Sequence, residues 1–349
     1  MRRAILFVAI AACHSSDKPP GDKPAPATTG SAGFDAVHVA LTGAPATGVA
    51  IDYSAYDART DTVWVPAGNG SVYVIANDRS VTAIPGWATK QVERDGKQRM
   101  MGPSSAAVGS AGVYIGNRGD ASVCLVDDKA LSRGTCATLD SSPDGLAYDA
   151  GANELWVTTP RDHSLRVLDG TTLAQKARIA LDGQPEGFAI DAVRHRFYTN
   201  LEDKDQTIAV TLATRTVDAT WSTGCGADGG RGMRLLAPAG QLVIACGATA
   251  RVLDVGHDGA LLSALPTVDG VDDIDVDPNG LAIFAGGKAG ALTYALLAGG
   301  VLKPLSVLQT APGARNAVFG SGNVIYLPHG SAGEVIVLSE TAKNVEHPR

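Results

Sequence analysis

The sequence predicts an all-β protein built from consecutive copies of one four-stranded unit. Two adjacent stretches that together span residues 146–225 repeat the same order: a strand of small apolar residues, an aromatic-led strand, an alternating strand and a last strand. Trp156 and Tyr198 occupy equivalent positions 42 residues apart, which is the repeat length of four-stranded β-propeller blades. The 41 glycines and the low content of charged residues, 19%, suit many short strands joined by tight turns.

The chain opens with a short targeting segment. Arg2 and Arg3 precede an apolar run from Ala4 to Ala12, which is too short to span a bilayer as a helix. A basic start followed by a short apolar core is typical of a secretory signal peptide. We therefore predict that residues 1–12 are a signal peptide.

The residues that follow this run resemble the bacterial lipobox. Ile10-Ala11-Ala12-Cys13 has a hydrophobic residue and two small ones before a cysteine, and the resemblance implies lipidation of Cys13. An ordinary secretory signal with an incidental cysteine is the alternative. By the same resemblance, His14 after the cysteine favours the outer membrane over the inner one. The predicted location is the cell envelope, with the membrane as a partner through the lipid.

The rest of the chain divides by composition. Residues 14–33 are rich in Pro, Gly, Ser, Thr and Lys, a composition that cannot form a core and predicts a disordered tether after Cys13. Residues 34–338 hold the repeated units, and residues 339–349 form a polar tail that we expect to be disordered.

Five cysteines become four if Cys13 carries lipid, and an oxidising exterior then predicts two disulfides. Cys124 and Cys136 flank one predicted hairpin, whereas Cys225 and Cys246 are placed on the same rim of one unit. We predict the pairs Cys124–Cys136 and Cys225–Cys246. Four buried free thiols are the alternative.

The second strand of the unit recurs seven times. The occurrences are Val63–Val65, Val113–Ile115, Leu155–Val157, Phe197–Thr199, Leu242–Ile244, Ala282–Phe284 and Ile325–Leu327. The spacing between the first two is longer because residues 87–103 form an insertion. We expect Trp87, in this insertion, to lie in a solvated loop, and a partner contact is the alternative.

The two ends of the repeat region complement each other. The last unit ends after one strand, 334–338, and lacks a fourth strand, whereas residues 35–41 form an alternating strand that precedes the first unit. Placing residues 35–41 in the last unit removes an unpaired edge. The sequence therefore predicts a seven-bladed β-propeller closed by its N-terminal strand.

Two of the units resemble the YVTN-type β-propeller repeat. Phe197-Tyr198-Thr199-Asn200 resembles the Tyr-Val-Thr-Asn motif that names the repeat, and Leu155-Trp156-Val157-Thr158 with Pro185-Glu186-Gly187 fits the same pattern. The resemblance is good over two units and recognisable over 143–338. It implies a propeller fold outside the cytoplasm, and it does not carry one function.

The repeat also predicts where a site lies. In a propeller, the loops that lead into the inner strands and those that join the second and third strands share one face around the channel. This predicted ligand-binding face holds Arg118, Asp144, His163, Glu186, Asp228, Arg231, Asp272, Asp273, Arg315, Asn316 and His329.

Two interpretations of this face stay open. Asp144 and Glu186 would be neighbours, as an acid–base pair or cation ligands require. Each also stands between Pro and Gly, where turn chemistry alone explains it. Arg231 and Arg315 could bind an anionic ligand, or they could neutralise the surrounding carboxylates.

Composition and motifs limit the function classes. A net charge of −7 and the lack of a basic, aromatic-interleaved stretch argue against nucleic-acid binding. No sequence motif indicates a cofactor, and a divalent cation remains the alternative.

Two function hypotheses follow. The first is a lipid-anchored binding or scaffold module that takes a small anionic ligand or a protein partner. The second is a lactonase- or lyase-like propeller enzyme that uses a divalent cation. The resemblance of the second hypothesis to metal-dependent lactonases implies a carboxylate in the first unit, where the loop Ala46-Thr47-Gly48 has none.

Overall fold

The structure is a computed structural model, and it describes residues 33–94 and 96–341. The predicted signal peptide, Cys13 and most of the tether lie outside the described residues, as do residues 342–349. No helix in the described part of the chain is long and apolar enough to cross a membrane.

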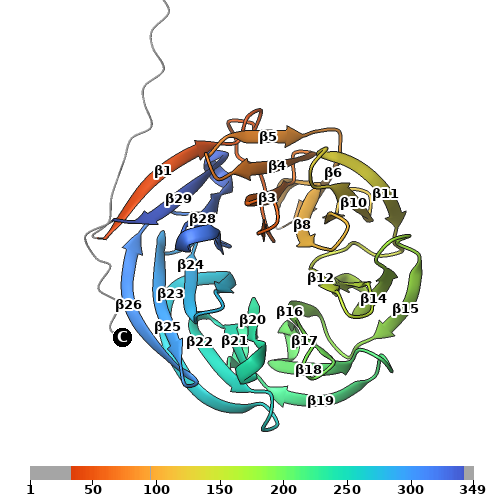
Figure 1. The fold of residues 1–349 in the computed structure, drawn as a ribbon, viewed down its shortest axis with the longest axis vertical. Helices are drawn as coiled ribbons and strands as arrows, with labels where there is room; N and C mark the ends of the chain where they lie inside the picture. The colour runs from red at the N-terminus through yellow and green to blue at the C-terminus, as the bar shows by residue number, and fades with distance from the viewer. Residues whose placement is uncertain (1–32, 95, 342–349) are drawn as a thin grey trace, which may run out of the picture.

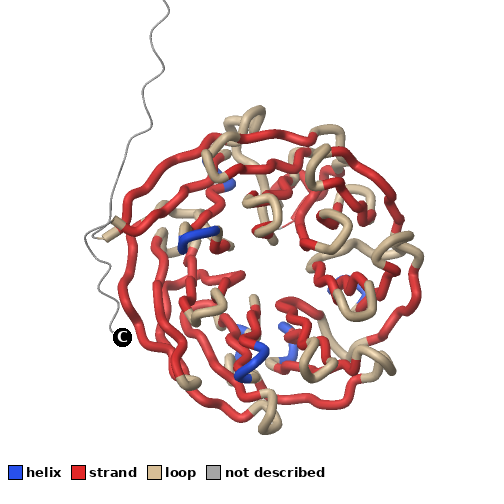
Figure 2. Tube along the Cα trace, in the orientation of Figure 1, coloured by secondary structure: helices blue, strands red, loops and turns tan. Residues whose placement is uncertain are grey.

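The molecule is an all-β propeller, as predicted. Antiparallel sheets succeed one another around a central channel in chain order (Figures 1 and 2). The first sheet contains β2 (Ala55–Asp57), β3 (Thr62–Ala67), β4 (Ser71–Ala76) and β5 (Val81–Ile84). The second contains β8 (Pro103–Val108), β9 (Val113–Asn117), β10 (Ser122–Asp127) and β11 (Ser132–Thr138).

The tandem copies in the sequence form the next two sheets. The third sheet contains β12 (Leu146–Asp149), β13 (Glu154–Thr159), β14 (Ser164–Asp169) and β15 (Gln175–Ala180). The fourth contains β16 (Pro185–Asp191), β17 (Arg196–Leu201), β18 (Gln206–Thr211) and β19 (Val217–Ser222). In each, the aromatic residue of the second strand pairs with a small residue of the first, Trp156 with Ala147 and Tyr198 with Ala189.

A seven-stranded sheet follows. Its strands are β20 (Met233–Leu236), β21 (Gln241–Ala245), β22 (Gly247–Asp254), β23 (Ala260–Val276), β24 (Leu281–Gly286), β25 (Ala291–Ala298) and β26 (Val301–Gln309). The 17-residue β23 pairs with β22 mainly through its first half and with β24 through its second half. One continuous strand therefore belongs to two successive units.

The last sheet joins the two ends of the described chain. It contains β27 (Val318–Phe319), β28 (Ile325–His329), β29 (Glu334–Glu340) and β1 (Phe34–Ala40). β1 pairs with β29 along its whole length, from Phe34 opposite Glu340 to Ala40 opposite Glu334. β29 thus runs two residues beyond the predicted end of the propeller, because Glu340 pairs with Phe34 and accepts a hydrogen bond from the Tyr294 hydroxyl.

Short 3₁₀ turns supply the helical residues of the described chain. They are η1 (Pro160–Asp162), η2 (Glu202–Lys204), η3 (Gly226–Asp228), η4 (Ala237–Ala239), η5 (Ser321–Asn323) and η6 (Gly330–Ala332).

The core lies between neighbouring sheets. Trp64, Trp156 and Tyr198 are fully buried there. The Trp156 ring stacks on Phe197 of the next sheet with ring centroids 5.1 Å apart. Large aromatic side chains bury the most apolar area per residue, and every unit except the one that contains β21 places one in its second strand.

The insertion is ordered, and the expectation of a solvated loop at Trp87 is wrong. β6 (Lys90–Arg94) and β7 (Lys97–Met101) form a hairpin. Trp87 is 5% exposed and packs between the first two sheets, where its indole nitrogen donates to the Ile84 carbonyl. The Arg133 guanidinium lies 4.9 Å from the Trp87 ring centroid. Burial of this apolar ring outweighs the polar composition of the segment around it.

Candidate functional site

The strand registers identify equivalent positions at the start of the inner strands. Ala55 pairs with Trp64 as Ala147 pairs with Trp156, and the other inner strands align in the same way. Counting back three residues from each of these inner-strand positions defines a set that we call the charged ring. Its members are Asp52, Ser104, Asp144, Glu186, Arg231, Asp272 and Arg315.

Asp52 and its neighbour Tyr53 were missed by the sequence analysis. Ile51 bridges to Ala67, and Tyr53 bridges to Ser105 of the second unit, so the first inner strand is approached through Asp52 rather than through Ala46–Gly48. The expectation that the first unit lacks a carboxylate at this position is therefore wrong. Asp52 has no Pro and Gly around it to mark a turn, and only the register relative to Trp64 could have revealed it.

Arg118 joins two members of the charged ring. Its Nη2 lies 2.6 Å from Asp52 Oδ2 and also contacts Asp144 Oδ1. Burial raises the pKa of Asp144 to about 6, against the opposing effect of the Arg118 charge. The other carboxylate oxygen of Asp144 is buried without a hydrogen-bond partner among the described residues.

Glu186 has a different environment. The Tyr53 hydroxyl donates to Glu186 Oε1 at 3.0 Å, and none of the ion pairs in the described part of the chain involves Glu186. Burial raises the pKa of Glu186 well above its usual range, and the charges of Asp144 and Asp52 raise it further. Glu186 therefore faces the negative charges of Asp144 and Asp52 without an ion-pair partner among the described residues.

The arginines on the other side of the charged ring are already paired. Arg315 lies 2.7 Å from Asp272, and Arg231 lies 3.6 Å from Asp272 and 3.8 Å from Glu202. Mutual neutralisation, one of the two roles considered for Arg231 and Arg315, is what these contacts support.

A second layer of charged groups lies one step further along the inner strands. Arg234 pairs with Asp273 and with Asp275, and burial raises the pKa of Asp273 to about 6. Asn316 donates to Asp52 Oδ1 at 3.0 Å and accepts from the Asp273 backbone N–H at 3.2 Å. Asn316 therefore links the first unit to Asp273 of the seven-stranded sheet.

Three predicted members of the face stand apart from these contacts. His163 is exposed and follows η1 with a φ of 50°. His329 pairs with Glu334, 2.9 Å from Oε1, and that same oxygen contacts His38 of β1. The side chain of Asp228 lies outside the described residues.

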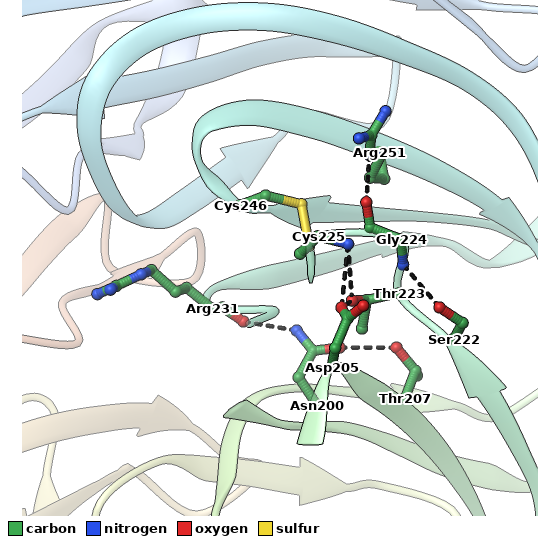
Figure 3. Close-up of a disulfide and its surroundings, with 10 residues drawn as sticks. All are labelled: Asn200, Asp205, Thr207, Ser222, Thr223, Gly224, Cys225, Arg231, Cys246 and Arg251. Atoms are coloured by element: carbon green, nitrogen blue, oxygen red, sulfur yellow. Dashed lines mark hydrogen bonds between the residues drawn. A yellow bond between two sulfur atoms is a disulfide. The ribbon is translucent and has the colours of Figure 1, made fainter. Parts of the chain in front are cut away.

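The disulfides are those predicted. Cys124 and Cys136 face each other across β10 and β11, and Cys225 is bonded to Cys246. Figure 3 shows the second bridge beside the segment that leads to Arg231, whose carbonyl accepts a hydrogen bond from Asn200 at 2.6 Å. The bridge and Asn200 therefore fix the backbone that carries Arg231.

Within residues 33–94 and 96–341, no group of three or more His, Cys, Asp or Glu side chains is arranged to hold a metal ion. The carboxylates of the charged ring are instead separated by arginines and by Tyr53.

No known protein family profile matches the chain, and no curated protein matches it. Solved structures do. Virginiamycin B lyase from Staphylococcus aureus is 14% identical, with a TM-score of 0.69 over 88% of this chain and 100% of that chain. A chain of the mitotic checkpoint complex is 11% identical, with a TM-score of 0.67 over 97% of this chain and 98% of that one.

The β-propeller domain of Cps50 (Swd1) from Myceliophteria thermophila is 9% identical, with a TM-score of 0.65 over 84% of this chain and 99% of that domain. At these identities the likeness shows the propeller fold alone. The similar structures include both a lyase and a chain of a protein complex, so fold does not select a function.

Proposed function

We propose that the protein is an extracytoplasmic binding module, anchored by lipid at Cys13, whose charged ring receives a positively charged group of its ligand. The observation that carries the proposal is Glu186, a partly buried carboxyl group that faces other acids and forms no ion pair with any of the described residues. An ammonium or guanidinium group placed there would supply the missing counter-charge.

The ion pairs of the arginines favour a ligand with positive charge. Arg118, Arg231 and Arg315 each contact at least one carboxylate of the charged ring. An anionic ligand would have to displace these carboxylates, and each displaced acid would then remain near the channel without its partner. A cationic ligand meets no such cost. It could be a free amine or a Lys or Arg side chain of a partner protein.

The proposed architecture has seven blades. Five four-stranded sheets each count as one blade, and the seven-stranded sheet counts as two that share β23. The pairing of β1 with β29 then closes the ring through the N-terminal strand. This arrangement puts β1, which begins at Phe34, at the outer edge of the last blade (Figure 1).

Thermal unfolding with matched probes tests the proposed function. The full chain carrying Cys13→Ser is heated with cadaverine, a diamine, or with 1,5-pentanediol, its uncharged analogue. We expect cadaverine alone to raise the melting temperature, and Glu186→Gln to abolish the increase. A cadaverine response that is absent, or that is unchanged in Glu186→Gln, contradicts the proposal.

One observation favours the metal-dependent enzyme as a second candidate. Asp52 supplies the first-unit carboxylate that the sequence analysis found missing, and Asp144 and Glu186 lie near it. Magnesium and calcium titrations in the same assay separate the two candidates. A thermal shift with either ion, lost in both Glu186→Gln and Asp52→Asn, would favour the enzyme.

A further inference from the structure

A cavity of about 740 Å³ lies further along the inner strands than the charged ring. We call it the inner cavity. Its wall is made of the residues three and four places after the charged ring in the inner strands. Those three places on are Ala55, Ala107, Ala147, Ala189, Arg234, Asp275 and Val318. Those four places on are Tyr56, Val108, Tyr148, Ile190, Leu235, Val276 and Phe319.

Tyr53 separates the inner cavity from the charged ring. Its hydroxyl donates to Glu186, whereas its ring lies 5.4 Å from the ring of Phe188, and both aromatic residues line the inner cavity. A strand rises by about 3.3 Å per residue, so the wall of the cavity lies roughly 10 Å further along the channel than the charged ring. The inner cavity and the charged ring are therefore separate places along the channel.

The residues of the wall explain why the channel is wide at the inner cavity and which groups it offers to a ligand. Four consecutive units place alanine at the same inner-strand position, which leaves the channel wide there. The next position carries aromatic or branched side chains in every unit. The hydroxyls of Tyr56 and Tyr148 bond to Asp61 and Asn153, which are not part of the wall. These tyrosines therefore offer ring surface rather than free hydroxyls.

The charged groups in the wall are already satisfied. Arg234 Nε lies 3.1 Å from Asp275 Oδ1, and Asp275 Oδ2 accepts a hydrogen bond from the Phe319 backbone N–H. Asp277 accepts three hydrogen bonds within its own turn, two from Asn279 and one from the Leu281 backbone N–H. A charged ligand would find no counter-charge here, and a neutral one would disturb no ion pair.

We propose that the inner cavity is a binding site for a small neutral aromatic molecule. The volume lies in the range of small-molecule pockets. The aromatic residues of the wall provide stacking and edge contacts for a ring. This site is independent of the function proposed for the charged ring.

The test uses N-phenyl-1-naphthylamine, a neutral aromatic amine that fluoresces strongly in apolar surroundings. It is titrated into the full chain carrying Cys13→Ser, without detergent. We expect saturable binding of one molecule per chain. The double variant Ala147→Phe/Ala189→Phe narrows the cavity, and we expect it to bind at least tenfold more weakly.

Two controls separate the inner cavity from other apolar surface. Ala130→Phe adds the same side chain on an exposed turn, and Leu305→Ser removes one of the exposed apolar residues of β26. Both variants should bind the probe as the parent does. The proposal is overturned if the parent shows no saturable site, if the folded double variant binds the probe unchanged, or if Leu305→Ser abolishes binding.

Discussion

The repeat determines where Glu186 lies, but residues of other units determine the pKa of its carboxyl group. The Pro-acid-Gly turn places it at the start of β16, and the repeat alone would suggest an ordinary turn carboxylate. Tyr53, Asp52 and Asp144 then change its chemistry, because each comes from another unit of the chain.

The first prediction concerns the pH dependence of this site. Glu186, Asp144 and Asp273 have higher pKa values in the folded chain than in the unfolded one, about 6 for the two aspartates. Folding therefore takes up protons, and the stability these groups confer is fully present at pH values below about 4 and is lost as the pH rises through the folded-state pKa.

Glu186→Gln keeps the acceptor for Tyr53 but cannot ionise. We expect its melting temperature to equal that of the parent below pH 4 and to exceed it at pH 8. Thermal unfolding followed across this pH range by circular dichroism checks the prediction. A variant less stable than the parent at pH 8 would contradict it.

Arg118 is the subject of the second prediction. Replacing it by methionine leaves Asp52 and Asp144 facing each other without the guanidinium, and removing one partner of a buried ion pair costs about 3–5 kcal/mol. We expect a loss near the lower value at pH 7, because Arg118 is partly exposed, and a smaller loss at pH 4, where Asp144 is protonated. Urea unfolding at both pH values measures it, with the exposed Arg161→Met as the control.

For single residues, the sequence could predict the position in the repeat but not which residues form ion pairs. The repeat located Asp144, Glu186, Arg231, Asp272 and Arg315 at equivalent sites. It could not show that Arg118 reaches Asp52, 66 residues earlier in the chain, because that contact depends on how neighbouring units pack. Arg234 was missed for a related reason: four of the equivalent residues are alanines, and nothing in the repeat marks that position as charged.

At the scale of elements, the two disulfides act on different structures. Cys124–Cys136 joins facing residues of one hairpin, whereas Cys225–Cys246 joins a loop to the end of β21. Their pairing was predictable, because each pair falls within one unit and the repeat fixes which strands are adjacent.

Removing the second bridge gives the third prediction. The double variant Cys225→Ser/Cys246→Ser frees a loop closed over 21 residues, and a loop of this size contributes about 3 kcal/mol to stability. We expect a loss of this order in denaturant unfolding, together with a weaker cadaverine response, because Arg231 follows the loop. The matched control Cys124→Ser/Cys136→Ser should lose stability but keep the cadaverine response.

Element boundaries show where sequence patterns fail. Lys90, Glu93 and Lys97 make the insertion look solvated, yet it forms the β6–β7 hairpin beside a buried Trp87. β23 shows the opposite case. Two predicted strands with a connection between them are one continuous strand, because Thr267–Asp269 keep an extended backbone that bridges two units.

At the scale of the whole molecule, the order of the sheets follows from the repeat, because each unit is a local antiparallel sheet and successive units can only stack side by side. The pairing of β1 with β29 is the long-range step. The sequence could anticipate it only by elimination, from one strand without a partner at each end.

The fourth prediction tests this pairing. Val39 is 7% exposed and packs with the apolar residues between the last and the first sheets. Val39→Asp buries a carboxylate among them, and we expect a loss of at least about 3 kcal/mol. Asp35→Asn, at an exposed position on the same strand, is the control and should be neutral. Equal stability of the two variants in urea unfolding would show that β1 contributes little to the ring.

The antiparallel pairing of β1 and β29 also sets how the molecule responds to mechanical load. Phe34, the first residue of β1, lies opposite Glu340, and the chain leaves the ring at that end. A force that pulls on the chain before Phe34 would act on the hydrogen bonds of β1 one after another, as in unzipping, rather than on all of them together. β1 would therefore detach at low force while the other sheets remain paired, and stretching the protein from its N-terminal side would open the ring before it unfolds any other unit.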